Sequence, residues 1–181
     1  PAAATITELM PKLIKHINAH EVVRRRLFRV DFLSTLSGEL VVTMVYHKAL
    51  GADWEAAAQA MREAWGINLI GRSKKQKLVV GEDFVTEILD VADVRYQYRQ
   101  VEGSFTQPNG PVNQHMLAWA SRQANGLGGD LLELYCGNGN FTLPLAKKFD
   151  SVLATEISKA SIAALEWALD ANDVSNVAHA R

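Results

Sequence analysis

The stretch from Leu131 to Phe141, LLELYCGNGNF, has the residue types and spacing of a ligand site. Its apolar start predicts a buried strand, and Gly137 and Gly139 then let the backbone turn sharply and approach a ligand, because no Cβ stands in the way. Glu156 ends the next predicted strand, SVLATE, where a carboxylate can accept hydrogen bonds from both hydroxyls of a ribose. Ligands of open parallel sheets settle at the carboxyl ends of the strands. The pattern therefore predicts a site for an adenosine-type cofactor.

The residues after the two glycines separate the possible cofactors. A dinucleotide fingerprint has a small residue where this chain has Thr142, which counts against an NAD-dependent enzyme. No Gly-Lys-Ser/Thr string follows, so a P-loop is excluded. Paired glycines also occur in purely structural turns, and the prediction of a cofactor therefore depends on the strand before them and the acid after them.

The first part of the chain contains the pattern of a sheet with helices. Apolar residues recur at steps of three and four from Thr5 to His20 and from about Asp53 to Trp65, which predicts two helices. Between them, LFRVDFLSTL and ELVVTMVYHK flank Ser37-Gly38, the spacing of a β-hairpin. Further short strands are expected at residues 68–72, 77–80 and 95–100. We expect residues 1–103 to form an α+β domain with helices on one face of the sheet.

After Phe105 the pattern becomes that of an α/β fold. A helix is expected from Gly110 to Gln123, where the glycines of NGLGGD end it. Strand, glycine turn, helix, strand and a second helix with Ser158 as its N-cap then follow in order. This is the opening of a doubly wound domain. Residues 104–181 are therefore expected to form the N-terminal part of a Rossmann-like domain.

Composition limits the class of protein. The chain has 181 residues, 48% of them hydrophobic, and a formal net charge of −1, so a nucleic acid would have to meet a local basic patch. Cys136 is the only cysteine, which excludes a disulfide within the chain and a multi-cysteine metal site, and no metal is expected. There is no apolar run of roughly 18 to 20 residues and no signal-peptide layout. We expect a cytoplasmic protein with no membrane partner.

Several strings together resemble one family. In order and with similar spacing, the chain resembles the tRNA (uracil-5-)-methyltransferases in LFRVDFLSTLSGELVV, MVYHK, LIGR, YRQVEGSFTQPN, LLELYCGNGNFTLPLA and VLATEI. The resemblance covers nearly the whole chain, and FTQPN followed by LYCGNGNF is its most specific part. It implies an S-adenosylmethionine-dependent enzyme that methylates C5 of a uridine in the T-loop of tRNA.

The resemblance also implies roles for individual residues. Gln107, Tyr135, Asn140 and Glu156 match the family's cofactor-binding residues, and Gly137 and Gly139 serve the same pocket through their backbone. Phe105 matches a contact to the extruded base, which needs an aromatic or apolar surface once it leaves its stack. A plain core aromatic is the alternative for Phe105.

The residues that perform the family's chemistry are expected outside this chain. The resemblance implies that a cysteine adds to C6 of the uracil, that C5 then takes the methyl group, and that a carboxylate removes the C5 proton. Those residues are expected after Arg181, and both ends of the chain resemble cuts. No catalytic residue is assigned here, Cys136 is given a structural role, and the chain alone is expected to be inactive.

Two basic groups are candidates for the RNA backbone, the first with Arg29 nearby and the second with Arg72 and Lys77. Their members are Arg24, Arg25, Arg26, Lys74 and Lys75. Phosphate contacts position a nucleic acid without selecting its sequence. A solvated protein edge is the alternative for each group.

Rival functions remain at this point. One is a ribosomal-RNA uracil-C5 methyltransferase, and another is a module that binds tRNA or cofactor without catalysis. We also expect self-association of this chain, because the first strand of a doubly wound sheet normally lies in its middle and would here present an unpaired apolar edge.

Overall fold

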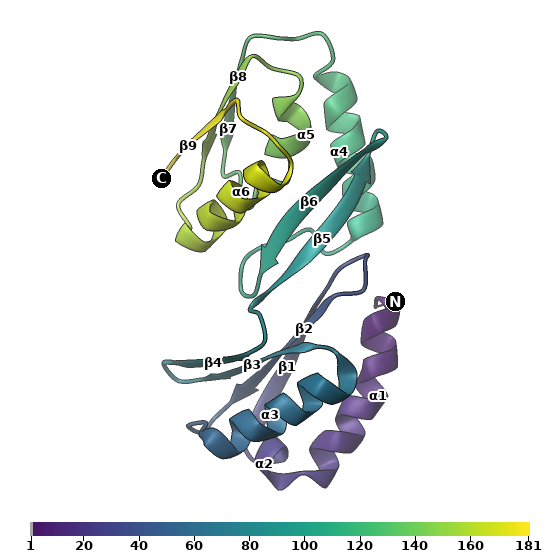
Figure 1. Ribbon diagram of the computed structural model, residues 1–181, viewed down its shortest axis with the longest axis vertical. Coiled ribbons are helices and arrows are strands. Elements are labelled where there is room, and N and C mark those ends of the chain that lie inside the picture. Colours follow the sequence, from purple (N-terminus) through teal and green to yellow (C-terminus); the bar gives the residue numbers. More distant parts are fainter. Residues whose placement is uncertain (1) are drawn as a thin grey trace. The chain divides into compact units, whose positions relative to one another are not determined.

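The computed structural model describes residues 2–181, which form two compact units divided between Val85 and Thr86 (Figure 1). The elements of the first unit are α1 (Ala4–Ala19), α2 (Glu21–Arg24), β1 (Leu27–Ser34), β2 (Leu40–Tyr46), α3 (Ala52–Trp65), β3 (Asn68–Ser73) and β4 (Gln76–Val80). Both helices expected from the apolar periodicity are present, each within one residue of its predicted bounds at either end. The short helix α2 was not predicted.

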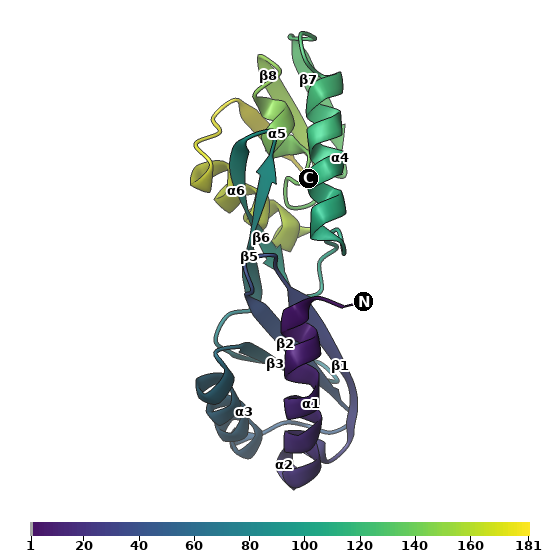
Figure 2. The same ribbon diagram turned by 90° about the vertical axis from the view of Figure 1, so that its right-hand side faces the viewer.

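The sheet of the first unit has the strand order β1-β2-β3-β4. β1 and β2 are antiparallel, as the hairpin pattern predicted, but β2 and β3 are parallel and are joined across the sheet by α3. Helix α1 lies beside β1 (Figure 2). Buried residues of all three helices meet one row of β2 residues in a single core, so the helices cover one face of the sheet, as expected.

A chain of buried hydrogen bonds ties three elements of this core together. Trp54 on α3 donates from its indole Nε1 to the Tyr46 hydroxyl at 2.9 Å, and that hydroxyl donates to the carbonyl of Val23 at 2.8 Å. Burial raises the pKa of Tyr46 to about 12, so the phenol stays protonated and remains a donor. The end of β2, the base of the basic surface described below, is thereby held in place.

The second unit contains a hairpin followed by a small α/β sheet. Its elements are β5 (Phe84–Val91), whose first residues fall before the division, β6 (Val94–Val101), α4 (Gly110–Gln123), β7 (Asp130–Leu134), α5 (Thr142–Ala146), β8 (Ser151–Thr155), α6 (Lys159–Ala171) and β9 (Val177–Ala180). The Ser158 hydroxyl accepts from the backbone N–H of Ser161, which confirms the predicted N-cap of α6. Strand β5 was not predicted.

The hairpin β5–β6 belongs with the second unit because it shares that unit's core. Leu89 on β5 and Tyr96 and Tyr98 on β6 are buried in one cluster with residues of α4, α5, β8 and α6. In Figure 1, α6 lies against this hairpin. The sequence put the change of pattern after residue 103, whereas the structure divides the chain before most of the hairpin.

The last three strands form a parallel sheet in the order β7-β8-β9. Ala154 on β8 faces the core of the unit. On the opposite face, Leu132 is paired in register with Leu153, and these side chains are 60% and 44% exposed. Leu134, also 60% exposed, extends this apolar patch along β7, whose outer edge has no strand partner among the described residues.

No helix among residues 2–181 has the length and apolar character that crossing a membrane requires. Over the same part of the chain, no three His, Cys, Asp or Glu side chains gather in a way that could hold a metal ion.

Candidate functional site

The predicted glycine turn follows β7 directly. Tyr135 has a left-handed φ of 58°, unusual for a residue with a Cβ, and Gly137 and Gly139 continue the turn at 59° and 87°. A Cβ at Gly139 would lie 2.6 Å from the Leu165 side chain on α6, so only glycine allows this close approach. At Gly137 a Cβ would meet no atom within 4 Å, so the backbone there borders open space.

Glu156 fixes the turn from the end of β8. Its carboxylate accepts from the backbone N–H of Gly137 at 3.1 Å and from that of Ser158 at 2.8 Å. A carboxylate has about four lone-pair positions, so it can accept further hydrogen bonds beside these two. The acid and the glycine turn that the sequence paired therefore lie in contact.

A cavity of about 140 Å³ opens beside this turn. It is bordered by the hairpin β5–β6, the segment after β6, the start of α4 and the turn itself. The lining residues are Leu89, Tyr98, Gln100, Phe105, Thr106, Gln107, Asn113, Glu133, Tyr135, Cys136, Gly137, Asn138, Asn140 and Phe141.

Most of the polar side chains of this cavity are amides, and several are engaged with the protein. Asn113 and Asn140 form a reciprocal pair, each donating to the other's side-chain oxygen at 2.8 and 3.0 Å. Asn138 donates to the backbone carbonyl of Arg99 at 3.0 Å. The Tyr98 hydroxyl donates to the carbonyl of Asn140 at 3.2 Å, which links β6 to the turn. These bonds give the wall a fixed arrangement before any ligand enters.

Burial raises the pKa of two groups that line the cavity, Glu133 and Cys136. Burial raises the pKa of Glu133, while the Thr142 hydroxyl donates to its carboxylate at 2.6 Å and opposes the shift. Burial, with the charges of Glu133 and Glu156, raises the pKa of Cys136 to about 11. A thiol with this pKa is protonated at neutral pH and is a poor nucleophile.

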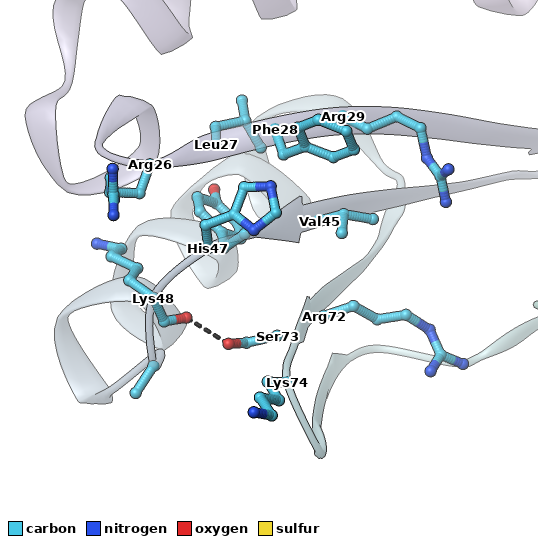
Figure 3. Close-up of a pocket in the computed structure, with 12 residues that line it drawn as sticks. Arg26, Leu27, Phe28, Arg29, Val45, His47, Lys48, Arg72, Ser73 and Lys74 are labelled. Atoms are coloured by element: carbon cyan, nitrogen blue, oxygen red, sulfur yellow. Dashed lines mark hydrogen bonds between the residues drawn. The ribbon is translucent and has the colours of Figure 1, made fainter.

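A second, larger cavity of about 1060 Å³ lies in the first unit, at the start of β1, the end of β2 and the end of β3. Figure 3 shows the Phe28 ring and the His47 imidazole in its middle, with Arg26 and Lys48 on one side and Arg29 and Arg72 on the other. The two rings meet edge to face with centroids 4.6 Å apart, and Phe28 is 64% exposed. An exposed aromatic surrounded by cations can stack a base and bind the phosphates beside it.

A comparison with protein families identifies the chain. The family model described as tRNA (Uracil-5-)-methyltransferase matches residues 1–181. The chain belongs to the tRNA (uracil-5-)-methyltransferase family.

Curated members of this family resemble the chain closely over about half of their own length. The tRNA/tmRNA (uracil-C(5))-methyltransferase of Neisseria meningitidis serogroup B is 54% identical over 180 residues, which are 99% of this chain and 50% of that protein. The enzyme of the same name from Dechloromonas aromatica is 55% identical over 181 residues, covering 100% of this chain and 50% of that protein. The chain thus spans about half the length of these relatives.

Solved structures resemble the chain in fold. The Pyrococcus abyssi tRNA (uracil-54, C5)-methyltransferase, crystallised with S-adenosyl-L-homocysteine, matches with a TM-score of 0.69 at 18% identity, over 96% of this chain and 46% of that one. The Methanocaldococcus jannaschii tRNA m1G37 methyltransferase matches with a TM-score of 0.51 at 12% identity, over 97% of this chain and 51% of that one. At these identities the likeness concerns the fold.

Most of the cofactor residues that the family resemblance implied come together in the smaller cavity. Gln107, Tyr135, Gly137 and Asn140 line it, and Phe105 lines it with 79% of its surface exposed, which makes a plain core aromatic untenable for this residue. Two predicted residues do not line it. Gly139 packs against Leu165, and Glu156 reaches the turn through Gly137. Sequence reasoning missed Gln100, Asn113, Asn138 and Glu133, because ordinary strand and helix positions do not show which side chains border a cavity.

The basic residues divide differently from the sequence groups. Arg26 and Lys74 line the larger cavity, whereas Arg25 and Lys75 do not, and Arg24 pairs with Glu21. Sequence reasoning missed Phe28, His47 and Lys48. Strand alternation would place Phe28 on the core face with Val30 and Phe32, and the irregular register between Leu27 and Arg29 leaves its ring exposed, so no local signal in the sequence marks it.

Proposed function

We propose that the protein containing this chain is an S-adenosylmethionine-dependent methyltransferase that methylates C5 of a uridine in the T-loop of tRNA, and that it acts in the cytoplasm, where its substrate is found. The observation that carries the proposal is the family match over residues 1–181. The cavity at the glycine turn supports it from an independent direction, because its chemistry suits an adenosyl ligand. In this proposal the second unit is the start of a Rossmann-like methyltransferase domain, and the first unit faces the RNA.

The residues present fit the methyl donor. Glu156 is held by two backbone N–H groups and keeps lone pairs that can accept from ribose hydroxyls. The open space at Gly137 lets a ligand approach the backbone, and Gln107, Asn140 and Tyr135 supply amide and phenol groups for the amino-acid end. When bound, S-adenosylmethionine supplies a methyl group from its sulfonium sulfur.

The larger cavity supports an RNA-binding role for the first unit. Arg26, Lys48 and Lys74 bring positive charge around the exposed Phe28 ring, although the chain as a whole has a net charge of −1. A concentration of cations on one surface of a nearly neutral chain is the pattern expected where a polyanion binds. Phe28 adds a stacking surface for an unpaired base.

We also propose that these 181 residues bind ligands without transferring a methyl group by themselves. Cys136 is buried and its raised pKa keeps it a thiol, so it does not offer the thiolate that addition to uracil C6 needs. The chain's contribution is then to hold the donor, receive the base and bind the RNA backbone.

The test is methyl transfer by the whole gene product. Unmodified tRNA transcript and labelled S-adenosylmethionine should yield 5-methyluridine, identified by mass spectrometry of the nucleosides, and a transcript with cytidine at the T-loop position should yield none. A tmRNA transcript and a ribosomal-RNA transcript are run beside it, and methylation of ribosomal RNA alone would replace the proposal with the rival function. Binding of donor and tRNA without any transfer would make the protein a binding module.

Self-association of the 181-residue chain is a further part of the proposal. The Leu132, Leu134 and Leu153 patch and the open edge of β7 offer an apolar surface for a second copy. Light scattering on this chain should show dimers or larger species, and the double variant Leu132→Lys, Leu153→Lys should shift them toward monomer. A wild-type chain that stays monomeric across concentrations would contradict this part.

A further inference from the structure

Strand β6 ends in a buried amide. Alternate residues of β6 point toward the core of the second unit, and Tyr96 and Tyr98 occupy this inward row with 3% and 1% of their surface exposed. Gln100 is the next residue of the row and is only 8% exposed. An amide at the end of an otherwise apolar or aromatic row is unexpected, because a buried amide needs hydrogen-bond partners.

The Gln100 side chain has no such partner within the described part of the chain. The three asparagines of the same cavity are engaged, since Asn113 pairs with Asn140 and Asn138 donates to a backbone carbonyl. Gln100 lines the cavity, so its unpaired amide borders the space that a ligand would fill. Its amide atoms are not among the completely buried unpaired atoms, so they keep access to the cavity and can bond to a ligand there.

The position of Gln100 indicates which ligand. The Tyr98 hydroxyl bonds to the carbonyl of Asn140, at the turn where the donor's amino-acid end is proposed to lie. Gln100 is two residues further along the strand, about 7 Å on. The chain then leads to Phe105, the exposed aromatic proposed for the extruded base. Along the chain, Gln100 thus lies between the residue that contacts the turn and the aromatic proposed for the base, and all three line the same cavity.

Gln100 could bind either the methyl donor or the uracil base, and the chemistry of these two ligands favours the base. Gln107, Asn140, Tyr135 and Glu156 are already proposed for the donor, whereas Phe105, the residue proposed for the base, offers no hydrogen-bonding group. A flipped base is read by hydrogen bonds to its polar edge as well as by stacking. Uracil presents an N3–H donor beside the O4 acceptor, and a carboxamide offers the complementary acceptor and donor.

We propose that the Gln100 side chain binds the N3–H and O4 edge of the uracil whose C5 receives the methyl group. This inference rests on the proposed function. O4 is bonded to C4, the neighbour of C5, so a contact there fixes the direction in which C5 faces. Gln100 would be a substrate-binding residue that orients the base.

The test compares two substitutions on one strand of the whole gene product. Gln100→Leu removes the amide at similar volume, and Gln97→Leu makes the same change at an exposed position of β6. The single-turnover methyl-transfer rate should fall about 10- to 100-fold for Gln100→Leu, the loss expected when directional hydrogen bonds to a reactant disappear. The Kd for S-adenosylmethionine, measured by calorimetry, should stay within about twofold for both variants.

Thermal melting separates binding from structure. Replacing an unpaired buried amide by leucine should leave the melting temperature unchanged or raise it. A lower melting temperature for Gln100→Leu than for the Gln97→Leu control would mean that the amide stabilises the fold, and it would overturn the inference.

A modified substrate locates the contact. A synthetic T-arm with 4-thiouridine at the target position replaces O4 by a weaker acceptor. It should slow the wild-type protein about tenfold and leave the already slow Gln100→Leu variant unaffected, since the same contact cannot be lost twice. Equal slowing of both proteins, or a loss of donor affinity in Gln100→Leu, would overturn the assignment to the base. Wild-type protein that transfers no methyl group overturns the proposed function too, whereas normal turnover by Gln100→Leu overturns this inference alone.

Discussion

The two cavities of this chain differ in the kind of recognition that their side chains permit. The cavity at the glycine turn is about 140 Å³, and its wall contains five amides, of which the three asparagines are held by hydrogen bonds to the protein. The cavity of the first unit is about 1060 Å³, and cations surround an exposed aromatic pair. The first can read the directions of donors and acceptors on a small ligand. The second can attract a charged polymer and stack a base.

Under the proposed function, this difference lets a chain of nearly zero net charge serve two ligands, an RNA and a small cofactor. Neutral amides recognise by geometry, which is insensitive to salt, whereas exposed Arg and Lys act through charge that salt screens. Substitutions in the two cavities should therefore change different measurements. Each of these measurements uses the whole gene product.

Glu156→Ala should weaken S-adenosylmethionine binding roughly 100-fold by calorimetry. The change removes a charged acceptor for the ribose, and it also releases the backbone N–H groups of Gly137 and Ser158, for which a loss of about 1.5 to 3 kcal/mol is typical. Affinity for tRNA should change little. Asp170→Ala, at an exposed acid on α6, is the matched control. An unchanged donor affinity in Glu156→Ala would mean that Glu156 only stabilises the turn, and it would contradict the assignment of this cavity to the donor.

Phe28→Ala should weaken tRNA binding about 10- to 100-fold, because stacking of one base on an aromatic ring contributes about 1 to 3 kcal/mol. The donor's Kd should be unchanged. Trp119→Ala, which removes another exposed aromatic outside both cavities, should leave tRNA binding as it is. Fluorescence anisotropy with labelled tRNA measures both variants. Equal losses in the two variants would mean that the Phe28 surface is not specific.

Arg26→Ala should weaken tRNA binding several-fold and make the plot of log K against log salt shallower by about 0.7 to 0.9, the value for one phosphate contact. Arg24→Ala is a close control, since Arg24 is a neighbouring arginine that pairs with Glu21 and does not line the cavity. Its salt slope should match the wild type. A shallower slope for Arg24→Ala but not for Arg26→Ala would mean that RNA phosphates bind near this basic group but outside the cavity.

Much of the fold could be read from local sequence. The periodicity of α1 and α3, the Ser158 cap and the strand before the glycine turn are properties of neighbouring residues, so they were predictable. Strand β5 was missed for a local reason as well. The turn from β5 to β6 uses Ala92 and Asp93, both with left-handed φ. Two-residue hairpin turns with this backbone usually contain Asn-Gly, so the sequence lacked the usual signal. In addition, the buried Glu87 interrupts the alternation of apolar and polar residues that would have indicated a strand.

The partners of each element could not be read in this way. Parallel pairing of β2 with β3 depends on how α3 crosses the sheet, and membership of the β5–β6 hairpin in the second unit depends on which core accepts Tyr96 and Tyr98. Both are decided by burial between segments far apart in the chain. This is why the boundary expected after residue 103 and the observed division before Thr86 differ.

For the candidate sites, the sequence by itself determined the glycine turn, the acid that meets it and the family, because these depend on residue types at fixed spacing. Only the tertiary structure decided which other side chains share the cavity. Asn113 and Gln100 are ordinary helix and strand residues until packing brings them beside the turn. Likewise, only the fold shows that Arg26 and not Arg24 lines the larger cavity, and that His47 contacts Phe28. The direction of each side chain depends on which face of its backbone is buried.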